Sequence, residues 1–208
     1  MPSMAPRSAG RPDALLAGAA DPGARPAASP AAVDHDANVV GALAIALADR
    51  IGDATAAAAG VEGVPAAALV ALHEWAGGRP IQALADGLRL SHSRTVRVID
   101  RLEAGGLAVR ASDPADGRSA LVDLTPRGRD AARRTMAARA GVLGGALAGL
   151  SPESRAALAQ LAEQVLEDVT DGRRAARATC RLCDAHACGH HAGRCPVTRG
   201  ADAAEAAL

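Results

Sequence analysis

The chain of 208 residues contains no lysine, no phenylalanine and no tyrosine, and Trp75 is its single tryptophan. All 23 of its basic side chains other than histidine are therefore arginines. Without lysine, the chain cannot form a phosphate-binding loop that ends in lysine, or a Schiff base with a carbonyl substrate. With almost no aromatic rings, it has no platform on which single-stranded nucleic acid could stack its bases. These absences exclude several classes of nucleotide-dependent enzyme and most sequence-specific RNA-binding modules.

The sequence also lacks long hydrophobic runs. No stretch reaches the roughly 18 uncharged apolar residues of a membrane-spanning helix, and residues 14–20 are too weakly apolar for a secretion signal. We therefore expect a cytoplasmic protein. Six of the twelve prolines fall before residue 34, among Gly, Ala and Ser, which predicts a disordered leader over residues 1–33.

Apolar periodicity predicts a mainly α-helical domain with a small β-hairpin over residues 34–172. Four of the expected helices start at a proline, and Ser91, Thr125 and Ser151 are placed to cap helix N-termini. Alternating residues around the turn at Asp116-Gly117 predict the hairpin. The helices are expected over residues 36–59, 65–75, 80–88, 91–104, 126–147 and 152–169, and the two strands over residues 107–110 and 120–124.

The helix expected over residues 91–104 has two different faces. Arg94, Arg97 and Arg101 fall on one side, and the apolar side chains Val96, Ile99 and Leu102 on the other. Arginine at this spacing can present its guanidinium to guanine edges or to phosphates in a major groove. The alternative is a solvated arginine face on an ordinary surface helix. Residues 89–139 carry eleven arginines against six acidic residues, which favours a duplex-binding surface.

A short helix, a tight link, a basic helix and a hairpin make a winged helix-turn-helix. Over about residues 36–170 the sequence resembles the MarR family of bacterial transcriptional regulators. The segments that carry the resemblance are LSHSRTVRVIDRLEAGGLAVR from Leu90, DPADGR from Asp113 and LVDLTPRG from Leu121. Ala115 departs from the pattern, because many relatives carry a basic residue there.

The resemblance implies a homodimer held by the first and last two helices, each flank carrying a winged domain. The first and last helices carry apolar stripes that a small winged domain cannot cover alone; the alternative is that these helices pack only within one subunit. Two-fold symmetry predicts a pseudo-palindromic DNA operator. We expect DNA contacts from seven residues: Ser91, His92, Ser93, Arg94, Arg97 and Arg101 in the helix, and Arg118 at the wing tip. By the same resemblance, Asp100 and Asp116 position the wing.

The segment over residues 173–208 lies outside the family pattern and is rich in cysteine. Cys180, Cys183, Cys188 and Cys195 have the spacing C-x2-C-x4-C-x6-C, which predicts a metal centre, with zinc as the expected metal and an iron–sulfur cluster as the alternative. His190 or His191 could replace one thiol as a ligand. The remaining alternative is a tail with unmetallated, reactive thiols.

We therefore expect a DNA-binding transcriptional regulator, most simply a repressor, and not an enzyme. The signals it could respond to are a small ligand, a metal or the redox state of the cysteines. For an effector we consider Trp75 and His73, but core packing explains Trp75 better and helix-end hydrogen bonding explains His73 better, so neither is assigned as a site. The two rival functions are a thiol-dependent redox enzyme and a sequence-independent architectural DNA-binding protein.

Overall fold

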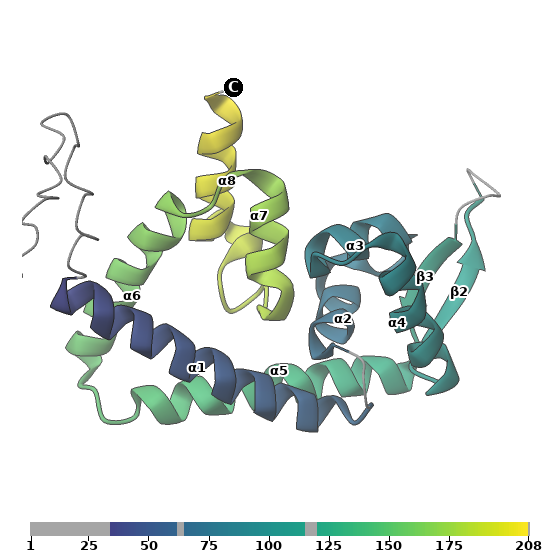
Figure 1. Cartoon of the computed structure of the whole chain (residues 1–208), viewed down its shortest axis with the longest axis horizontal. Helices are drawn as coiled ribbons and strands as arrows, with labels where there is room; N and C mark the ends of the chain where they lie inside the picture. The colour runs from purple at the N-terminus through teal and green to yellow at the C-terminus, as the bar shows by residue number, and fades with distance from the viewer. Residues whose placement is uncertain (1–33, 62–64, 115–119, 208) are drawn as a thin grey trace, which may run out of the picture.

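The computed structural model of the chain describes residues 34–61, 65–114 and 120–207. The leader expected over residues 1–33 lies outside these ranges. Figure 1 shows the arrangement of the helices and strands. In chain order they are α1 (His35–Ala59), α2 (Ala66–Ala71), the π-helical turn η1 (Leu72–Ala76), β1 (Arg79–Pro80), α3 (Ile81–Leu88), α4 (His92–Ala104), β2 (Ala108–Ser112), β3 (Ala120–Leu124), α5 (Pro126–Leu147), α6 (Pro152–Asp168), α7 (Gly172–Thr179), the 3₁₀ turns η2 (Cys180–Leu182) and η3 (His190–Ala192), and α8 (Pro196–Ala206).

The winged domain, which we define as α2 to β3, is a small helical cluster with a three-stranded antiparallel sheet in the order β1-β3-β2. Its core is built from fully buried aliphatic side chains contributed by every layer. Among them are Leu69 of α2, Leu84 of α3, Ile99 and Leu102 of α4 and Val122 of β3. The mainly α fold with a small β-wing expected from the sequence is confirmed.

Two features of the winged domain differ from the sequence prediction. The helix expected over residues 65–75 changes to π-helical hydrogen bonding at Leu72. The two-residue strand β1 was not predicted, because two residues are too few for an alternating pattern. It pairs Arg79 with Val122 and Pro80 with Leu121 at the edge of the sheet, where the missing N–H of a proline is tolerated.

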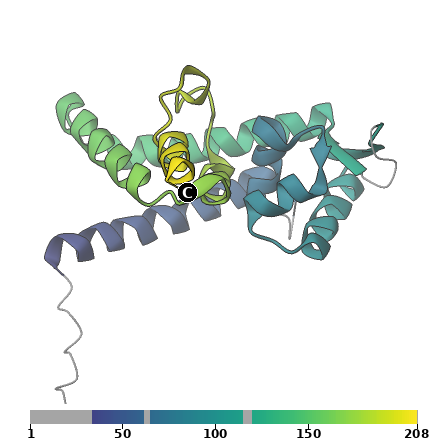
Figure 2. The ribbon, with the colours of Figure 1, turned by 90° about the horizontal axis from the view of Figure 1, so that it is seen from above.

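Helices α1 and α5 pack against each other and form the base of the molecule. Figure 2 shows that they lie together near the winged domain and diverge away from it, where α6 turns back from the end of α5. Within the single chain, α6 has no buried residue. None of the described helices has the length and hydropathy needed to cross a lipid bilayer.

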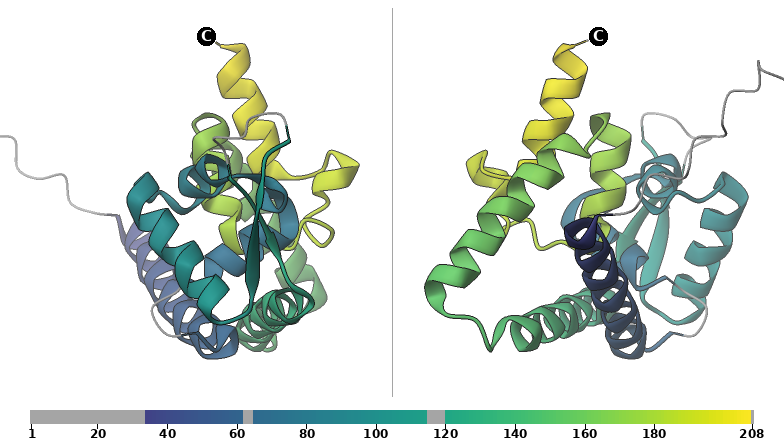
Figure 3. Two further views of the ribbon diagram at one scale, coloured as in Figure 1. Left: turned by 90° about the vertical axis from the view of Figure 1, so that its right-hand side faces the viewer. Right: turned by 60° about the vertical axis from the view of Figure 1, so that its left-hand side comes forward.

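The last part of the chain folds into helices that the sequence analysis did not predict. We call Gly172–Ala206 the C-terminal module. Its helix α8 packs on α6 and α7, α7 packs on α3, and η2 packs on α2. The module therefore lies between the long helices and the winged domain, and the end of α8 points away from α1 and α5 (Figures 1 and 3).

Candidate nucleic-acid interface and cysteine pocket

Helix α4 begins where the sequence predicted, at a capped serine. The Ser91 hydroxyl accepts a hydrogen bond from the Arg94 N–H at 3.3 Å, and the Thr95 hydroxyl donates to the Ser91 carbonyl at 3.0 Å. The inner face of α4 consists of Thr95, Val98, Ile99 and Leu102, all buried. Val96, which we expected on this face, is only half-buried. Val98 takes its place in the core.

The outer face of α4 carries the helix residues predicted to contact DNA. All of them are exposed to solvent: Ser91, His92, Ser93, Arg94, Arg97 and Arg101. The hydroxyl groups of Ser91 and Ser93 lie 3.2 Å apart at the start of the helix. Since the opposite face is buried in the core, the orientation of this polar face relative to the domain is fixed. The other two predicted residues, Asp116 and Arg118, lie outside the described residues.

Arg110 of β2 joins the wing to α4, a role that the sequence analysis missed. Its Nη2 donates to Asp100 Oδ1 at 2.7 Å, its Nη1 pairs with Glu103, and its backbone N–H donates to Glu103 Oε1 at 2.9 Å. Asp100, which we expected to position the wing, thus pairs with Arg110 of strand β2. No local pattern could reveal this contact, because strand and helix must pack before the charges meet.

The junction between the wing and α5 explains the Leu-Thr-Pro-x-Gly segment. The Thr125 hydroxyl accepts from the Gly128 N–H at 3.0 Å and donates to the Gly106 carbonyl at 2.8 Å. The Thr125 N–H donates to the Leu107 carbonyl at 3.0 Å. A Cβ on Gly128 would lie well inside van der Waals contact with that same carbonyl oxygen. The base of the wing is therefore held directly against the first turn of α5.

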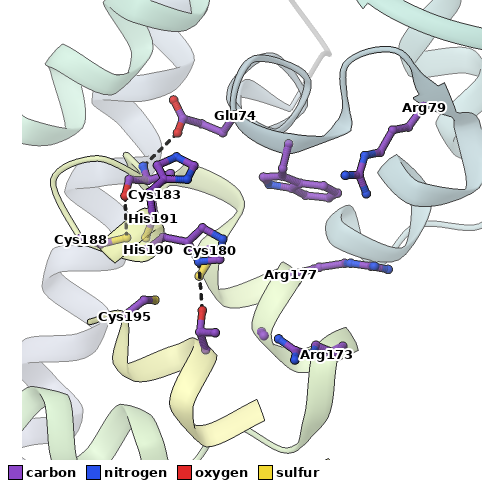
Figure 4. A pocket seen from close by; sticks show the side chains of 14 residues that line it. Glu74, Arg79, Arg173, Arg177, Cys180, Cys183, Cys188, His190, His191 and Cys195 are labelled. Carbon is purple, nitrogen blue, oxygen red and sulfur yellow. Dashed lines mark hydrogen bonds between the residues drawn. The ribbon is translucent and has the colours of Figure 1, made fainter. Parts of the chain in front are cut away.

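A cavity of about 500 Å³ lies between the C-terminal module and the winged domain. The two walls of this cysteine pocket are chemically different. Figure 4 shows cysteine and histidine side chains on one side and arginine side chains on the other. Trp75 also lines the pocket, whereas His73 is not among the residues that line it. The labelled side chains are Cys180, Cys183, Cys188, Cys195, His190 and His191 on the first side, and Arg79, Arg173 and Arg177 on the second.

The loop that carries the cysteines is tied to both neighbouring parts of the molecule. The Ala185 N–H donates to Glu74 Oε2 of η1 at 2.9 Å. Arg139 of α5 donates from Nη2 to the sulfur of Cys183 at 3.9 Å. At the far end of the module, Arg199 of α8 donates to Glu167 of α6. The pocket thus lies where the winged domain, α5 and α6 are linked through one segment.

The structure brings all four predicted cysteines to this pocket, and all four are free thiols. Cys195 is buried and the other three are half-buried. The pKa of Cys183 is lowered by a hydrogen bond from Cys180 and by the charges of Arg139 and Arg181. The same hydrogen bond, together with burial, raises the pKa of Cys180. Cys183 is therefore the more acidic thiol of this pair.

The second pair of thiols is Cys188 and Cys195. Burial raises the pKa of Cys188, and a hydrogen bond with Cys195 acts in the same direction, whereas the His190 N–H lowers it. Among the described residues, no three His, Cys, Asp or Glu side chains are spaced as a ready-made metal site. The four cysteines expected to form a metal centre thus line one pocket, and the metal centre itself stays a prediction.

Known proteins share part of this sequence and architecture. The model of the MarR family matches residues 59–119, which include the helix-turn-helix and the first strand of the wing, β2. RV1404 from Mycobacterium tuberculosis is 25% identical over 69% of this chain and 99% of its own, with a TM-score of 0.57. A probable transcriptional regulator from Pseudomonas aeruginosa is 32% identical over 61% of this chain and 96% of its own, with a TM-score of 0.47.

Wild-type MarR from E. coli, in its apo form, is similar in fold, with 22% identity over 61% of this chain and 96% of its own and a TM-score of 0.51. No curated protein matches the chain. The residues matched by the family model include α2, α3, α4 and β2. Residues 59–119 of the chain therefore form a winged helix of the MarR family of transcriptional regulators.

Proposed function

We propose that the chain is a sequence-specific double-stranded DNA-binding regulator that acts as a homodimeric repressor. The observation that carries the proposal is the two-sided structure of α4. One side is buried in the winged-domain core, and the other exposes Ser93, Arg94 and Arg97 together. An α-helix fits the major groove, where arginine can bind guanine O6 and N7 through two hydrogen bonds. α4 then supplies the base contacts.

The wing supports the same orientation. Arg110 links β2 to α4 through ion pairs with Asp100 and Glu103. The described part of the wing is thus held to the helix whose exposed face we expect to read bases. We expect Arg118 at the tip of the hairpin to reach the minor groove next to the site read by α4.

Exposed apolar stripes on α1 and α6 support the homodimer. Val39 and Leu43 on one face of α1 are 50% and 46% exposed, and Leu161 and Val165 of α6 are 60% and 57% exposed. A solitary chain would leave these aliphatic side chains in water, whereas a second copy can bury both stripes in a self-complementary interface. Two winged domains related by two-fold symmetry require half-sites about one helical turn apart. Binding of such a dimer over a promoter would block transcription.

The experiment is selection of a preferred operator from random duplex DNA, followed by affinity measurements on that operator. Arg94→Ala and Arg97→Ala should each weaken binding by about 1–3 kcal/mol and relax the preference at one base pair. Arg174→Ala is the matched control, since it removes the same charge from an exposed site on the C-terminal module. It should leave the base preference unchanged.

Two outcomes would contradict the proposal. If the double variant Arg94→Ala/Arg97→Ala binds the selected operator as tightly as the parent protein, α4 does not read bases. If selection yields no preferred sequence, the architectural DNA-binding alternative replaces the regulator. A thioredoxin-like redox site lies in a βαβ unit. The cysteines of this chain do not, because the fully described segment Gly172–Ala206 consists of helices, turns and loops without a strand.

A small-molecule effector remains a prediction of the sequence analysis. The cysteine pocket has a volume within the usual range for small-molecule sites. It also contacts both the winged domain and the C-terminal module, so a ligand there could alter their relative position. We propose it as the place to search for an effector, with Trp75 as the fluorescent reporter.

A further inference from the structure

The four cysteines of the C-terminal module lie on four different pieces of local structure that meet at one pocket. Cys180 is the first residue of η2, directly after α7, Cys183 follows η2, Cys188 lies in the loop, and Cys195 precedes the first residue of α8. We propose that these four side chains bind one zinc ion as a tetrathiolate site that holds the C-terminal module together. The inference is independent of DNA binding and goes beyond the proposed function.

The module has too small an apolar core to explain its fold. Between Gly172 and Ala206, all of which the structure describes, the buried apolar side chains are Ala178, Cys195, Val197 and Ala201. Alanine contributes little to hydrophobic stabilisation because it buries a single methyl group. Small segments without an adequate core generally need a metal or disulfides to fold. The cysteines are at the position where such a crosslink would join α7 to α8.

The backbone between the cysteines places two of them at the pocket. The Cys188 sulfhydryl donates to the Ala185 carbonyl at 3.5 Å, and the His190 N–H donates to the same carbonyl at 3.0 Å. Gly189, between Cys188 and His190, has a φ of 71°, a conformation that glycine adopts without strain. Cys195 is the N-cap residue of α8. Zinc binding would release the protons of the coordinating thiols.

The surroundings can also balance the charge of the site. Four thiolates around Zn²⁺ carry a net charge of −2, and a buried charge needs nearby opposite charges. The Arg139 guanidinium lies 3.9 Å from the Cys183 sulfur. Arg79, Arg173 and Arg177 form the opposite wall of the pocket (Figure 4). Glu74 also lines the pocket, but its carboxylate accepts the Ala185 N–H.

All four thiols interact with one another on the same side of the pocket: Cys180 with Cys183, Cys188 and Cys195, and Cys188 with Cys183 and Cys195. A tetrahedral zinc site with Zn–S distances of about 2.3 Å needs its sulfur atoms close together, whereas an iron–sulfur cluster spreads its cysteine ligands around a larger inorganic core. Among the described residues the thiols do not yet form a set of three or more ligands at metal-binding spacing. Closing the site requires the sulfur atoms to move closer together, and metal binding supplies the free energy for this movement.

The test uses full-length protein, reduced and freed of metal, titrated with Zn²⁺ without oxygen. We expect one zinc per chain, loss of reactivity toward a thiol reagent at all four cysteines, and a changed emission from Trp75, which lines the same pocket. Co²⁺ in place of Zn²⁺ should give the visible absorption of a tetrahedral tetrathiolate site. Protein that takes up no zinc, or takes it up with its thiols still reactive, overturns the proposal.

Variants identify the ligands. Cys180→Ser/Cys183→Ser should weaken zinc affinity by at least about 100-fold. His190→Ala/His191→Ala is the matched control on the same wall and should keep one zinc and the cobalt spectrum. If the histidine variant loses zinc while Cys195→Ser retains it, a mixed site replaces the tetrathiolate. Two further outcomes contradict the zinc proposal. One is a brown protein that contains iron and sulfide after anaerobic purification. The other is disulfide formation among the four cysteines without zinc uptake.

Discussion

Single residues at the base of the wing determine how closely the elements of the winged domain approach. Arg110 neutralises two carboxylates of α4 from the neighbouring strand, and Gly128 lets the first turn of α5 lie against the Leu107 carbonyl. Both residues act through contacts distant in sequence. Arg110 could therefore be mistaken for a solvated strand residue, and Gly128 for an unfavourable residue in a helix.

The Gly128→Ala variant should be less stable than the parent protein by about 3 kcal/mol. The added Cβ would overlap a backbone carbonyl that already accepts the Thr125 N–H, so neither side can move cheaply. The measurement is urea unfolding followed by circular dichroism. Gly52→Ala in α1 is the control: nothing lies within 4 Å of its Cβ position, and alanine should add up to about 1 kcal/mol of stability. Equal unfolding midpoints for Gly128→Ala and the parent protein would contradict the close contact between α5 and the Leu107 carbonyl.

At the scale of elements, three helices begin at side-chain caps that the sequence predicted. Ser91, Thr125 and Ser151 each accept a hydrogen bond from a backbone N–H three residues later. These caps are local, since the acceptor and the donor belong to the same turn. What differs between them is the burial of the helix that each one starts.

Thr125→Ala should destabilise the protein more than Ser151→Ala. Loss of either cap should reduce the unfolding free energy by about 1 kcal/mol. Thr125 additionally donates to the Gly106 carbonyl, and loss of this second bond should raise the total for Thr125→Ala to about 2 kcal/mol. Thermal or urea unfolding of the two variants gives the difference. A larger effect at Ser151 would mean that the α5 cap is not coupled to the wing.

At the scale of the whole molecule, the C-terminal module connects surfaces that the rest of the chain leaves apart. It contacts α6 through Arg199 and Glu167, the winged domain through Ala185 and Glu74, and α3 through α7. Helix α6 lies beside α8 of this module (Figure 3). Helix α6, the cysteine pocket and α4 are thus linked through one contiguous set of packed elements, in which α8 contacts α6 and α7, and α3 contacts α7 and α4.

The double variant Leu161→Asp/Val165→Asp should convert the proposed dimer to a monomer. Both side chains are more than half exposed in the single chain, so the charges are harmless to the fold but would be buried without partners in a dimer. Light scattering after size-exclusion chromatography measures the mass. Val109→Asp, at a similarly exposed valine on the wing, is the control and should leave the mass unchanged. A stable dimer of the double variant would place the interface elsewhere.

Sequence alone determined the parts of this protein that depend on local chemistry. The bounds of α5, the cap of α4 and the basic face of that helix could be predicted, because each follows from residues within a few turns of one another. The hairpin strands were also predicted, with β3 correctly bounded at Ala120–Leu124 and β2 lying close to its expected range. The family resemblance rested on these same segments.

Tertiary structure decided the features that require distant segments to meet. The strand β1 exists only because β3 lies beside it, and Asp100 pairs with Arg110 only because the wing packs on α4. The cysteine spacing predicted a cluster, but not that α7 and α8 would frame it against Glu74 and Arg139. Local patterns specify which elements form, whereas contacts between elements depend on the packing of the complete core.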